Sequence, residues 1–335
     1  MSNDDRSDVP AQSGGQVDVQ QDATDATIQL TLDKLVAEIT EVRRELNALR
    51  SGVGAFSNSL QEIHALVGPF GASMPDGTML VQTIHKTKYL IDPLDLIIAP
   101  NLIVYRQWEA DLSALFIQSA HKDMVFVDVG ANFGYFTCLL GSRIGNSGHG
   151  KIWAIEPNPN CVKLLQRNVS INWAMCPISI LPIGVGAAPA TMQLAVPKDR
   201  ASNGSILSTG HGRLPDDTAV YAVEIQRLDD VLPETQIVDC IKIDVEGHEW
   251  SVLSGARKTI ERSLGIKIIM EWAPDQMKTA GYSADQMCDL LEELGLSVFS
   301  PQKGCTLTTL VGKGLDRDHL RNWGYDNLIL SRKAH

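Results

Sequence analysis

The sequence predicts an α/β protein with a doubly wound, mostly parallel sheet. From residue 125 onward, apolar runs of strand length alternate with runs of helix length, as in chains whose parallel strands are joined by crossover helices. The run Val125–Val129 is nearly all apolar, which is typical of a strand covered by helices on both faces. It breaks at Gly130 into a glycine turn, and the next strand, Lys151–Ile155, ends in Glu156.

The turn from Gly130 to Gly134 indicates a strand–turn–helix unit that holds a ligand, or else a turn that only packs a helix on a strand. Backbone at such a turn can approach a ligand closely. Glu156 follows the turn by roughly twenty residues, at the end of its strand, where a carboxylate accepts hydrogen bonds from ribose hydroxyls. A dinucleotide site needs glycine where Asn132 stands, to make room for a pyrophosphate. We therefore expect S-adenosylmethionine, which has a ribose and no pyrophosphate.

The remaining elements continue the alternation. A polar segment containing short strands, at about 190–226, interrupts it. The predicted strands lie at Ile178–Ile183, Ile237–Ile243, Lys267–Met270 and Asn327–Leu330, and the predicted helices lie at Tyr135–Ile144, Asn160–Asn168, Leu228–Leu232 and Ala284–Leu294.

The composition favours a soluble globular chain and disfavours some partners. Of the 335 residues, 44% are hydrophobic and 21% are charged, and the formal net charge is -11. Nucleic acids and anionic membranes select clustered Lys and Arg, so no nucleic-acid partner is expected. No apolar run is long enough to span a bilayer, and the first residues do not resemble a secretory signal, so we expect a cytoplasmic protein. The six cysteines include no Cys-x-x-Cys pair, so neither disulfides nor a zinc site are expected.

The first 67 residues divide into a tail and a stem. Residues 1–27 are acidic and polar and are predicted to be disordered. Residues 28–67 are predicted to form a coiled coil, because apolar residues recur every seven positions in two registers. One register contains Leu32, Ile39, Leu46, Val53 and Leu60, and the other contains Leu35, Val42, Leu49, Phe56 and Ile63.

This stem predicts a homo-oligomer, a dimer or a trimer, joined through residues 32–63. Glu38 with Arg43, and Glu45 with Arg50, occupy positions that suit parallel helices. The alternative is one amphipathic helix folded back on the rest of the chain. A break is expected at Gly52 and Gly54, since each glycine costs about 1 kcal/mol relative to alanine in a helix.

Residues 68–121 are predicted to form a linker, a β-hairpin and an N-terminal cap, ahead of a cofactor-binding domain at 122–335. Residues 68–77 are rich in turn formers, and Thr78–Ile84 and Lys88–Ile91 have the composition of hairpin strands. A helical stretch within 95–118 should cover the glycine turn. Its Tyr105 and Glu109 are expected to be core residues, with contact to the cofactor as the alternative.

Ionisable residues gather after the strand predicted at Ile237–Ile243. The carboxyl edge of a parallel sheet is where ligands bind, and buried charges there are costly unless solvated, paired or bound to a ligand. Two of these residues have structural alternatives, Glu249 on a solvated helix face and Glu246 as a helix cap. The residues are Asp244, Glu246, His248 and Glu249, with Glu271 at the end of the next strand.

Three motifs together resemble the FkbM family of S-adenosylmethionine-dependent methyltransferases. They are Val127–Thr137, Glu156–Pro159 and Lys242–Glu249, and the resemblance extends over roughly residues 78–332. It implies a class I methyltransferase fold, with a seven-stranded sheet whose last strand is antiparallel. It also implies O-methylation of a sugar, glycan or natural-product hydroxyl, so the expected partner is a small-molecule or glycan acceptor.

The resemblance also implies which residues form the site. Asp244 would face the reacting methyl group, and Glu156 would hold the ribose. The methionine moiety would be surrounded by Asp128, Gly130, Asn132 and Gly134, and the adenine bordered by Gly184 and Val185.

An alcohol is a poor nucleophile, so a base near neutral pH is expected. His248 has the ordinary pKa closest to that task, and Asp244 and Glu246 are the alternatives. No metal is predicted, although the carboxylates of Asp244, Glu246 and Glu271 leave a Mg²⁺ site as an alternative.

Two other function classes stay open at this point. The chain could be a non-catalytic, oligomeric interaction protein that carries a methyltransferase fold, because fold alone does not determine function. A nucleic-acid methyltransferase is disfavoured by the acidic balance and by the lack of an Asn-Pro-Pro-Tyr-like run after the fourth strand.

Overall fold

The structure, a computed structural model, describes residues 15–67, 71–197, 204–206, 217–301, 306–307 and 314–332. Side chains are described outside 15–28 and 61–67. The chain divides into two compact units, Met1–Val67 and Gly68–His335.

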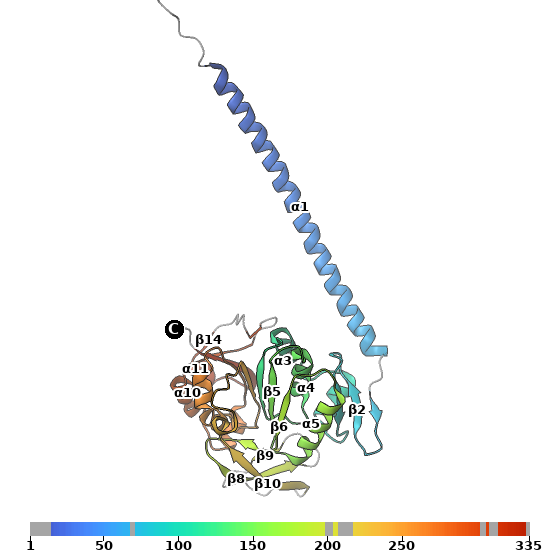
Figure 1. The fold of residues 1–335 in the computed structure, drawn as a ribbon, viewed down its shortest axis with the longest axis vertical. Coiled ribbons are helices and arrows are strands. Elements are labelled where there is room, and N and C mark those ends of the chain that lie inside the picture. Colours follow the sequence, from blue (N-terminus) through green and yellow to red (C-terminus); the bar gives the residue numbers. More distant parts are fainter. Residues whose placement is uncertain are drawn as a thin grey trace, which may run out of the picture. The chain divides into compact units, whose positions relative to one another are not determined.

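The first unit contains one continuous helix, α1 (Gly15–Val67), of 53 residues (Figure 1). The predicted disorder of residues 1–27 is wrong for 15–27, and residues 1–14 lie outside the described part. A polar composition excludes a packed core, but the Gln and Ala of this stretch are good helix formers. The predicted break at Gly52 and Gly54 is also wrong, because a cost of about 1 kcal/mol each does not outweigh cooperative helix propagation.

The apolar residues of both heptad registers are exposed on α1. The exposed fractions of these residues lie between 48% and 66%. The residues are Leu32, Leu35, Ile39, Val42, Leu46, Leu49, Val53, Phe56 and Leu60. The side chain of Ile63 lies outside the described part. The coiled coil itself stays a prediction.

The second unit is built on an eight-stranded mixed sheet, which confirms the α/β prediction. Its order is β14-β13-β15-β12-β11-β4-β5-β6. Five neighbouring strands, from β6 to β12, are parallel, and β15 lies antiparallel between β12 and β13. The strands are β4 (Val125–Val129), β5 (Lys151–Ile155), β6 (Ile178–Leu181), β11 (Cys240–Ile243), β12 (Lys267–Trp272), β13 (Leu296–Phe299), β14 (Gly314–Leu315) and β15 (Asp326–Arg332).

The expected count of seven strands is too low. The additional strand is β14, a two-residue edge strand antiparallel to β13. So short a segment has no periodicity from which a strand could be predicted.

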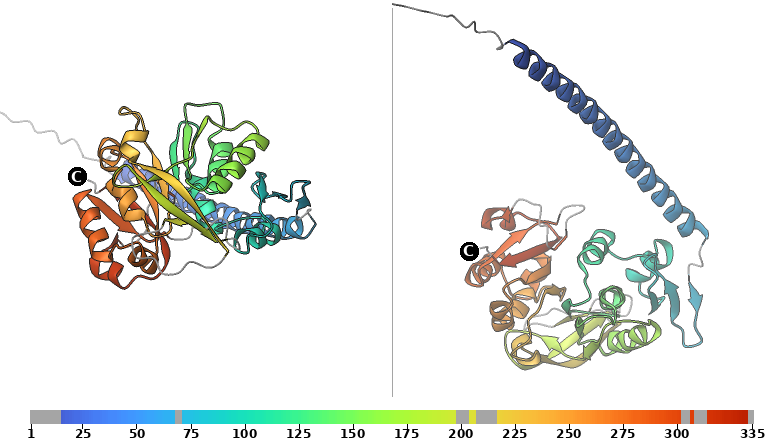
Figure 2. Two further views of the ribbon diagram at one scale, coloured as in Figure 1. Left: turned by 90° about the horizontal axis from the view of Figure 1, so that it is seen from below. Right: turned by 45° about the horizontal axis from the view of Figure 1, so that its top comes forward.

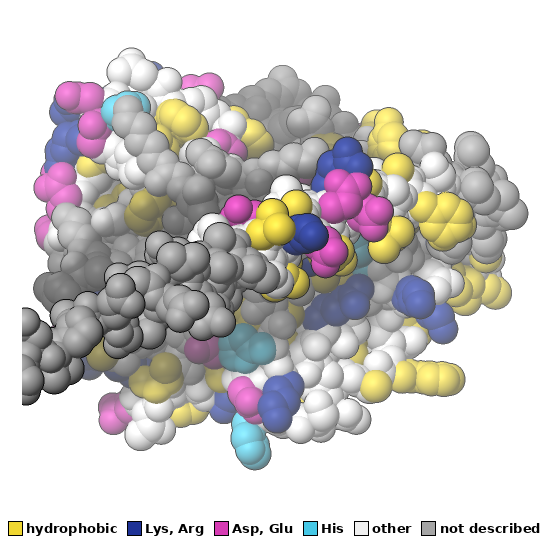
Figure 3. All heavy atoms as spheres, turned by 90° about the horizontal axis from the view of Figure 1, so that it is seen from above, with side chains coloured by type: hydrophobic (Ala, Val, Ile, Leu, Met, Phe, Trp, Pro, Cys, Tyr) yellow, Lys and Arg dark blue, Asp and Glu magenta, His cyan; other side chains and the backbone are white. Residues whose placement is uncertain are grey.

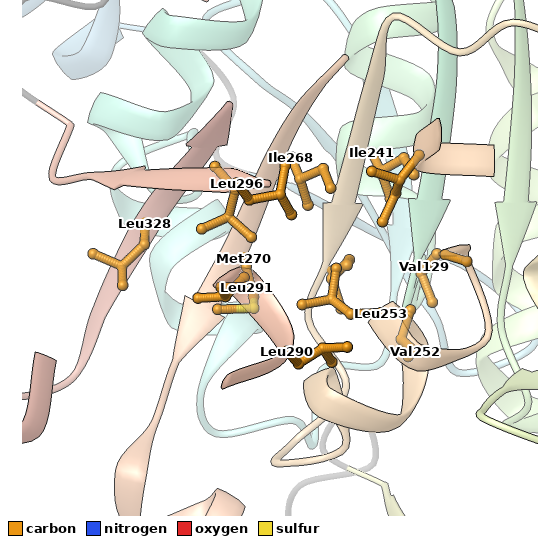
Figure 4. Packing of buried hydrophobic residues seen from close by; sticks show 14 of the residues in the cluster. Val129, Ile241, Val252, Leu253, Ile268, Met270, Leu290, Leu291, Leu296 and Leu328 are labelled. Carbon is orange, nitrogen blue, oxygen red and sulfur yellow. The ribbon is translucent and has the colours of Figure 1, made fainter. Parts of the chain in front are cut away.

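Helices cover both faces of this sheet. One face packs against α2 (Ile98–Val104), α3 (Ala110–Ser119), α4 (Tyr135–Ile144) and α5 (Pro159–Ile171). The other packs against α6 (Leu228–Val231), α7 (Glu249–Ser254), α8 (Arg257–Arg262), α9 (Pro274–Thr279), α10 (Ala284–Glu293) and α11 (Arg317–Arg321). Figure 4 shows this second layer, where Val252, Leu253 and Leu290 face Ile241 and Met270 from the sheet. Burying such side chains contributes about 1.5–3 kcal/mol each.

A smaller sheet lies at one end of the larger one (Figures 1 and 2). Its order is β7-β10-β8-β9, and the long strands β8 and β10 pair antiparallel. The strands are β7 (Gly184–Val185), β8 (Ala190–Pro197), β9 (Ser205–Ile206) and β10 (Thr218–Gln226). This sheet has its own small apolar core, formed by Leu194, Val196, Val223 and Ile225.

The segment before α2 forms a three-stranded antiparallel sheet of β1 (Ala72–Ser73), β2 (Met79–Gln82) and β3 (Lys88–Ile91). The expected linker therefore contributes a strand, β1. Asn168, a fully buried amide on α5, ties β3 to the glycine turn. Its Oδ1 accepts a hydrogen bond from the Leu90 N–H at 2.7 Å, and its Nδ2 donates to the carbonyls of Phe133 and Leu90 at 2.8 and 3.1 Å.

On the face drawn in Figure 3, acidic and basic side chains are interspersed with hydrophobic ones. None of the described helices is both long and apolar enough to cross a bilayer. Five cysteines are buried and free, and Cys305 lies outside the described part.

Candidate active site

A cavity of about 210 Å³ lies at the carboxyl edge of the larger sheet. Its wall is formed by the ends of β4, β5, β11 and β12 and by parts of the smaller sheet. It brings together eight of the predicted site residues, which are Gly130, Asn132, Glu156, Gly184, Val185, Asp244, Glu246 and His248. Asp128 and Gly134 are not among its lining residues. The two informative stretches of sequence therefore meet in one cavity.

Gly130 is where these stretches meet at the backbone. Its φ is +82°, and an added Cβ would lie 1.9 Å from the carbonyl oxygen of Asp244. The Asp244 N–H donates to the Val129 carbonyl at 3.1 Å, which holds the end of β11 against the turn. At Gly134, with φ +91°, a Cβ would instead meet Leu165 at 2.4 Å, so this glycine lets α4 and α5 approach each other.

Glu156 is buried at the end of β5, with both oxygens bound to backbone. Oε2 accepts from the Asn132 N–H and Oε1 from the Asn158 N–H, each at 2.8 Å. Burial raises the pKa of Glu156 to about 7, although these two hydrogen bonds lower it. Each carboxylate oxygen retains a further acceptor position. Glu156 thus holds the turn and can also accept hydrogen bonds from a ligand.

Lys242 lies beneath the cavity and pairs with its wall. Its Nζ is 2.7 Å from Asp244 Oδ2, and its side chain is 4% exposed. Burial lowers the pKa of Lys242, but the charges of Asp244, Asp128 and Glu109 outweigh that effect and raise it, so the ammonium stays charged. Asp128 is buried beside it and accepts from the Thr137 hydroxyl at 2.6 Å. Asp128 therefore supports the wall from behind.

Glu246 and His248 stand on the turn between β11 and α7. Glu246 has φ +54° and accepts from Gln276 Nε2 at 2.7 Å. Burial raises its pKa to about 7, and the charge of Asp244 raises it further. His248 is buried, with Nε2 3.3 Å from the carbonyl oxygen of Ile206.

Glu249 does not lie on a solvated helix face, and that expectation is wrong. It is fully buried, and its Oε1 accepts from the backbone N–H groups of Val245 and Gly247 at 3.2 and 3.1 Å. Burial raises the pKa of Glu249 to about 7. Glu249, and not Glu246, therefore binds the backbone N–H groups that precede α7. The helix α7 ends at Ser254, and α8 follows as a separate helix. Because Glu249 binds backbone groups that precede it by only a few residues, this motif forms a tight turn before α7.

Glu271 and Tyr325 form a pair that sequence reasoning did not assign to the catalytic or cofactor set. Glu271 is 7% exposed, and the Tyr325 hydroxyl donates to its Oε1 at 2.6 Å. Burial and the charge of Asp244 raise the pKa of Glu271 to about 8. Both residues line the cavity. The expected topology could have indicated this pair. An antiparallel last strand begins at the sheet edge where β12 ends, which brings Tyr325 close to Glu271.

Glu109 also lines the cavity. It precedes α3 with φ +41°, and its Oε2 accepts from Asn327 Nδ2 at 3.3 Å. Burial raises the pKa of Glu109. Tyr105 is 64% exposed and is not among the lining residues.

The described wall of the cavity suits S-adenosylmethionine. It carries five carboxylates and no Lys or Arg among its described residues, and the carboxylates are Glu109, Glu156, Asp244, Glu246 and Glu271. Such a wall attracts a sulfonium cation and repels a pyrophosphate. In the described ranges, no three Asp, Glu, His or Cys side chains are grouped so that they could hold a metal ion.

Comparisons with known proteins agree with this geometry. Residues 128–298 match the methyltransferase FkbM domain. Methyltransferase sdnD of Sordaria araneosa is 26% identical over 198 residues, which cover 51% of this chain and 73% of that protein. The hexuronic acid methyltransferase AglP of Haloferax volcanii is 27% identical over 154 residues, which cover 46% of this chain and 58% of AglP.

Solved structures to which this chain shows a weaker similarity include two TYW2 proteins. TYW2 of P. horikoshii, in complex with MeSAdo, is 15% identical with a TM-score of 0.40, covering 76% of this chain and 70% of that one. TYW2 of M. jannaschii, in complex with AdoMet, is 13% identical with a TM-score of 0.37, covering 76% and 84%. The domain match is the stronger finding, because it spans half of the chain and contains the glycine turn, Glu156 and residues 242–249. This chain therefore belongs to the FkbM family of methyltransferases, and its cofactor is S-adenosylmethionine.

Proposed function

We propose that this protein is an O-methyltransferase that acts on a hydroxyl of a sugar, glycan or natural product. The observation that carries the proposal is the acid-walled cavity in which the glycine turn, Glu156 and Asp244 meet. The name of AglP, a hexuronic acid methyltransferase, supports a sugar-like acceptor.

The proposed cofactor site follows the cavity wall. Glu156 accepts hydrogen bonds from the ribose hydroxyls, and Gly184 and Val185 border the adenine. Gly130 and Asn132 lie beside the methionine moiety, with Asp128 and Gly134 supporting the turn from behind. Asp244, held by Lys242, stands closest to the reacting methyl group.

The cofactor supplies a methyl group on a sulfonium, which carries its own leaving group. The protein therefore has to hold an acceptor oxygen in line with that methyl group and accept its proton. Asp244 suits positioning, because the Lys242 ammonium fixes its Oδ2 at 2.7 Å. His248 Nε2 lies 3.3 Å from the Ile206 carbonyl oxygen, so in the tautomer that protonates Nε2 this nitrogen donates there and Nδ1 is the ring nitrogen that can accept a proton.

A second cavity, of about 290 Å³, gives the acceptor a place next to the first. The two share Ile206 and Glu246. The second cavity is also lined by Ser205, Asp275, Gln276 and Thr279, whose hydroxyl, carboxylate and amide groups suit a polyhydroxylated molecule. We place the part of the acceptor that does not react in this cavity.

The test is calorimetric titration of S-adenosylmethionine into the wild type, Glu156→Ala and the control Glu234→Ala, whose side chain is exposed. Losing two charge-assisted hydrogen bonds, at about 1.5–3 kcal/mol each, should weaken binding at least a hundredfold in Glu156→Ala and leave the control unchanged. Transfer of labelled methyl to methyl hexosides and methyl hexuronosides then tests the acceptor class. A wild type that binds no cofactor at millimolar concentration would favour the non-catalytic interaction protein.

We also propose that residues 32–63 of α1 join two or three chains in a parallel coiled coil. Exposed apolar residues in both heptad registers support this, as do the Glu38–Arg43 and Glu45–Arg50 charge patterns. Light scattering on Ile39→Asp should show monomers, whereas Thr40→Asp, which adds the same charge outside the registers, should keep the oligomer. A monomeric wild type at micromolar concentration would contradict the proposal.

A further inference from the structure

We propose that Glu271 accepts the proton of the acceptor hydroxyl, and that Tyr325 positions Glu271 for this task. The inference rests on the proposed methyl transfer to oxygen. Glu271 ends β12 and lines the cavity.

Strand pairing brings the two residues together. In the register of β12 with β15, Trp272 lies opposite Asp326, so Tyr325 enters the sheet edge next to Glu271. Tyr325 is 69% exposed as a residue, yet its hydroxyl reaches Glu271 Oε1 at 2.6 Å. A hydrogen bond this short holds one oxygen in place and directs the other.

Glu271 differs from the other carboxylates of the cavity wall because its second oxygen, Oε2, is buried without a hydrogen-bond partner. Within the described residues, three buried carboxylate oxygens have no hydrogen-bond partner, and they are Asp128 Oδ1, Glu249 Oε2 and Glu271 Oε2. Of these three residues, Glu271 is the one that lines the cavity. An unpartnered buried acceptor is costly, and the hydroxyl of a methyl acceptor is a suitable donor for it.

The surroundings of Glu271 make its carboxylate more basic than usual. Burial is the largest cause, the charges of Asp244, Glu246 and Glu249 add to it, and the hydrogen bond from Tyr325 opposes it. The resulting pKa, about 8, lies in the range where a general base is most effective at neutral pH.

The proposed step balances in atoms and charge. A lone pair of the acceptor oxygen forms the new O–C bond, and the electron pair of the breaking S–C bond stays on sulfur. The hydroxyl proton moves to Glu271 Oε2, so the carboxylate becomes a neutral acid while the sulfonium charge disappears. The acid then releases its proton to water, which restores the carboxylate.

The first test needs no acceptor. In full-length protein labelled with δ-¹³C-glutamate, one resonance should be absent from Glu271→Gln and should titrate near pH 8 in the wild type. Removing the tyrosine hydroxyl in Tyr325→Phe should shift this titration to higher pH, because the hydrogen bond from Tyr325 lowers the pKa of Glu271. Titration below pH 6, or no shift in Tyr325→Phe, would overturn the inference.

The second test uses turnover on whichever methyl hexoside or hexuronoside the wild type methylates. General-base catalysis contributes about 10²–10⁴-fold, so Glu271→Gln should lower kcat at least a hundredfold, a larger loss than its loss of cofactor affinity. Glu271→Asp should recover part of the rate, and Tyr325→Phe should move the acidic limb of the pH–rate profile upward. Wild-type kcat in Glu271→Gln would reject this inference alone, whereas a wild type without cofactor binding would reject the proposed function.

Discussion

Substituting Gly130 by alanine probes the contact between the two motifs. In the native structure an alanine Cβ at this position would lie 1.9 Å from the Asp244 carbonyl oxygen, and φ is +82°. Real Cβ contacts stay beyond 3.0 Å, so the turn and the end of β11 would have to separate by about 1.1 Å. That movement strains the bond from the Asp244 N–H to the Val129 carbonyl and the bond from the Gly130 N–H to the Ile155 carbonyl.

The expected destabilisation has two parts. A left-handed alanine costs about 1–2 kcal/mol, and weakening one or two hydrogen bonds adds about 1–2 kcal/mol. The sum, about 2–4 kcal/mol, corresponds to a fall in Tm of roughly 5–15 °C for a unit of this size. Cofactor affinity should fall at least tenfold, because Asp244 moves with the strand.

Two glycines provide matched controls for this measurement. Gly281 has φ +93° with nothing within 4 Å of an added Cβ, so Gly281→Ala isolates the backbone strain. Gly265 has neither a positive φ nor a neighbour within 4 Å, so Gly265→Ala should leave Tm nearly unchanged. All six tryptophans lie between residues 108 and 323, so their fluorescence reports on the second unit. Equal losses in Gly130→Ala and Gly281→Ala would refute the close approach of Asp244.

Two further predictions concern stability. Burial raises several glutamate pKa values above 4.5, to about 7 in Glu156, Glu246 and Glu249 and to about 8 in Glu271. The folded chain thus binds more protons than the unfolded chain between about pH 5 and 8, so the urea midpoint of unfolding should fall as the pH rises. The fall should be less steep in Glu249→Gln, which lacks one of these carboxyl groups. A midpoint that rises with pH would contradict this prediction. Asn168→Ala should lower the free energy of unfolding by about 2–4 kcal/mol because it leaves buried backbone groups unpaired. Asn172→Ala, which removes three comparable bonds from a more exposed amide, should cost less in the same urea titration, and an equal loss would argue against the burial effect.

The sequence predicted those parts of the fold whose signal is local. The apolar runs at Val125–Val129 and Lys151–Ile155 are strands with the predicted bounds, because strands buried on both faces need continuous apolar residues. The glycine turn was legible for a similar reason, since few residues other than glycine tolerate φ near +82°.

Features that depend on distant pairing were not predictable. Glu271 and Tyr325 are 54 residues apart, and they meet only because β15 inserts antiparallel between β12 and β13. The small sheet was missed as a unit for the same reason, since β8 and β10 pair antiparallel although residues 198–217 separate them in the sequence. The burial of Glu249 reflects a tight turn whose geometry no periodicity encodes.

The burial of Glu156 has a consequence for how the protein responds to its surroundings. With a pKa of about 7, this carboxyl is partly protonated near neutral pH before a ligand arrives. Ribose hydroxyls and a sulfonium charge at the proposed site both favour the ionised form, so cofactor uptake would expel a proton. Cofactor affinity should therefore rise between pH 6 and 8, and calorimetry in buffers of different ionisation enthalpy would count the protons released. Protons and the methyl donor would therefore compete for Glu156, and a lower pH would weaken binding of the methyl donor.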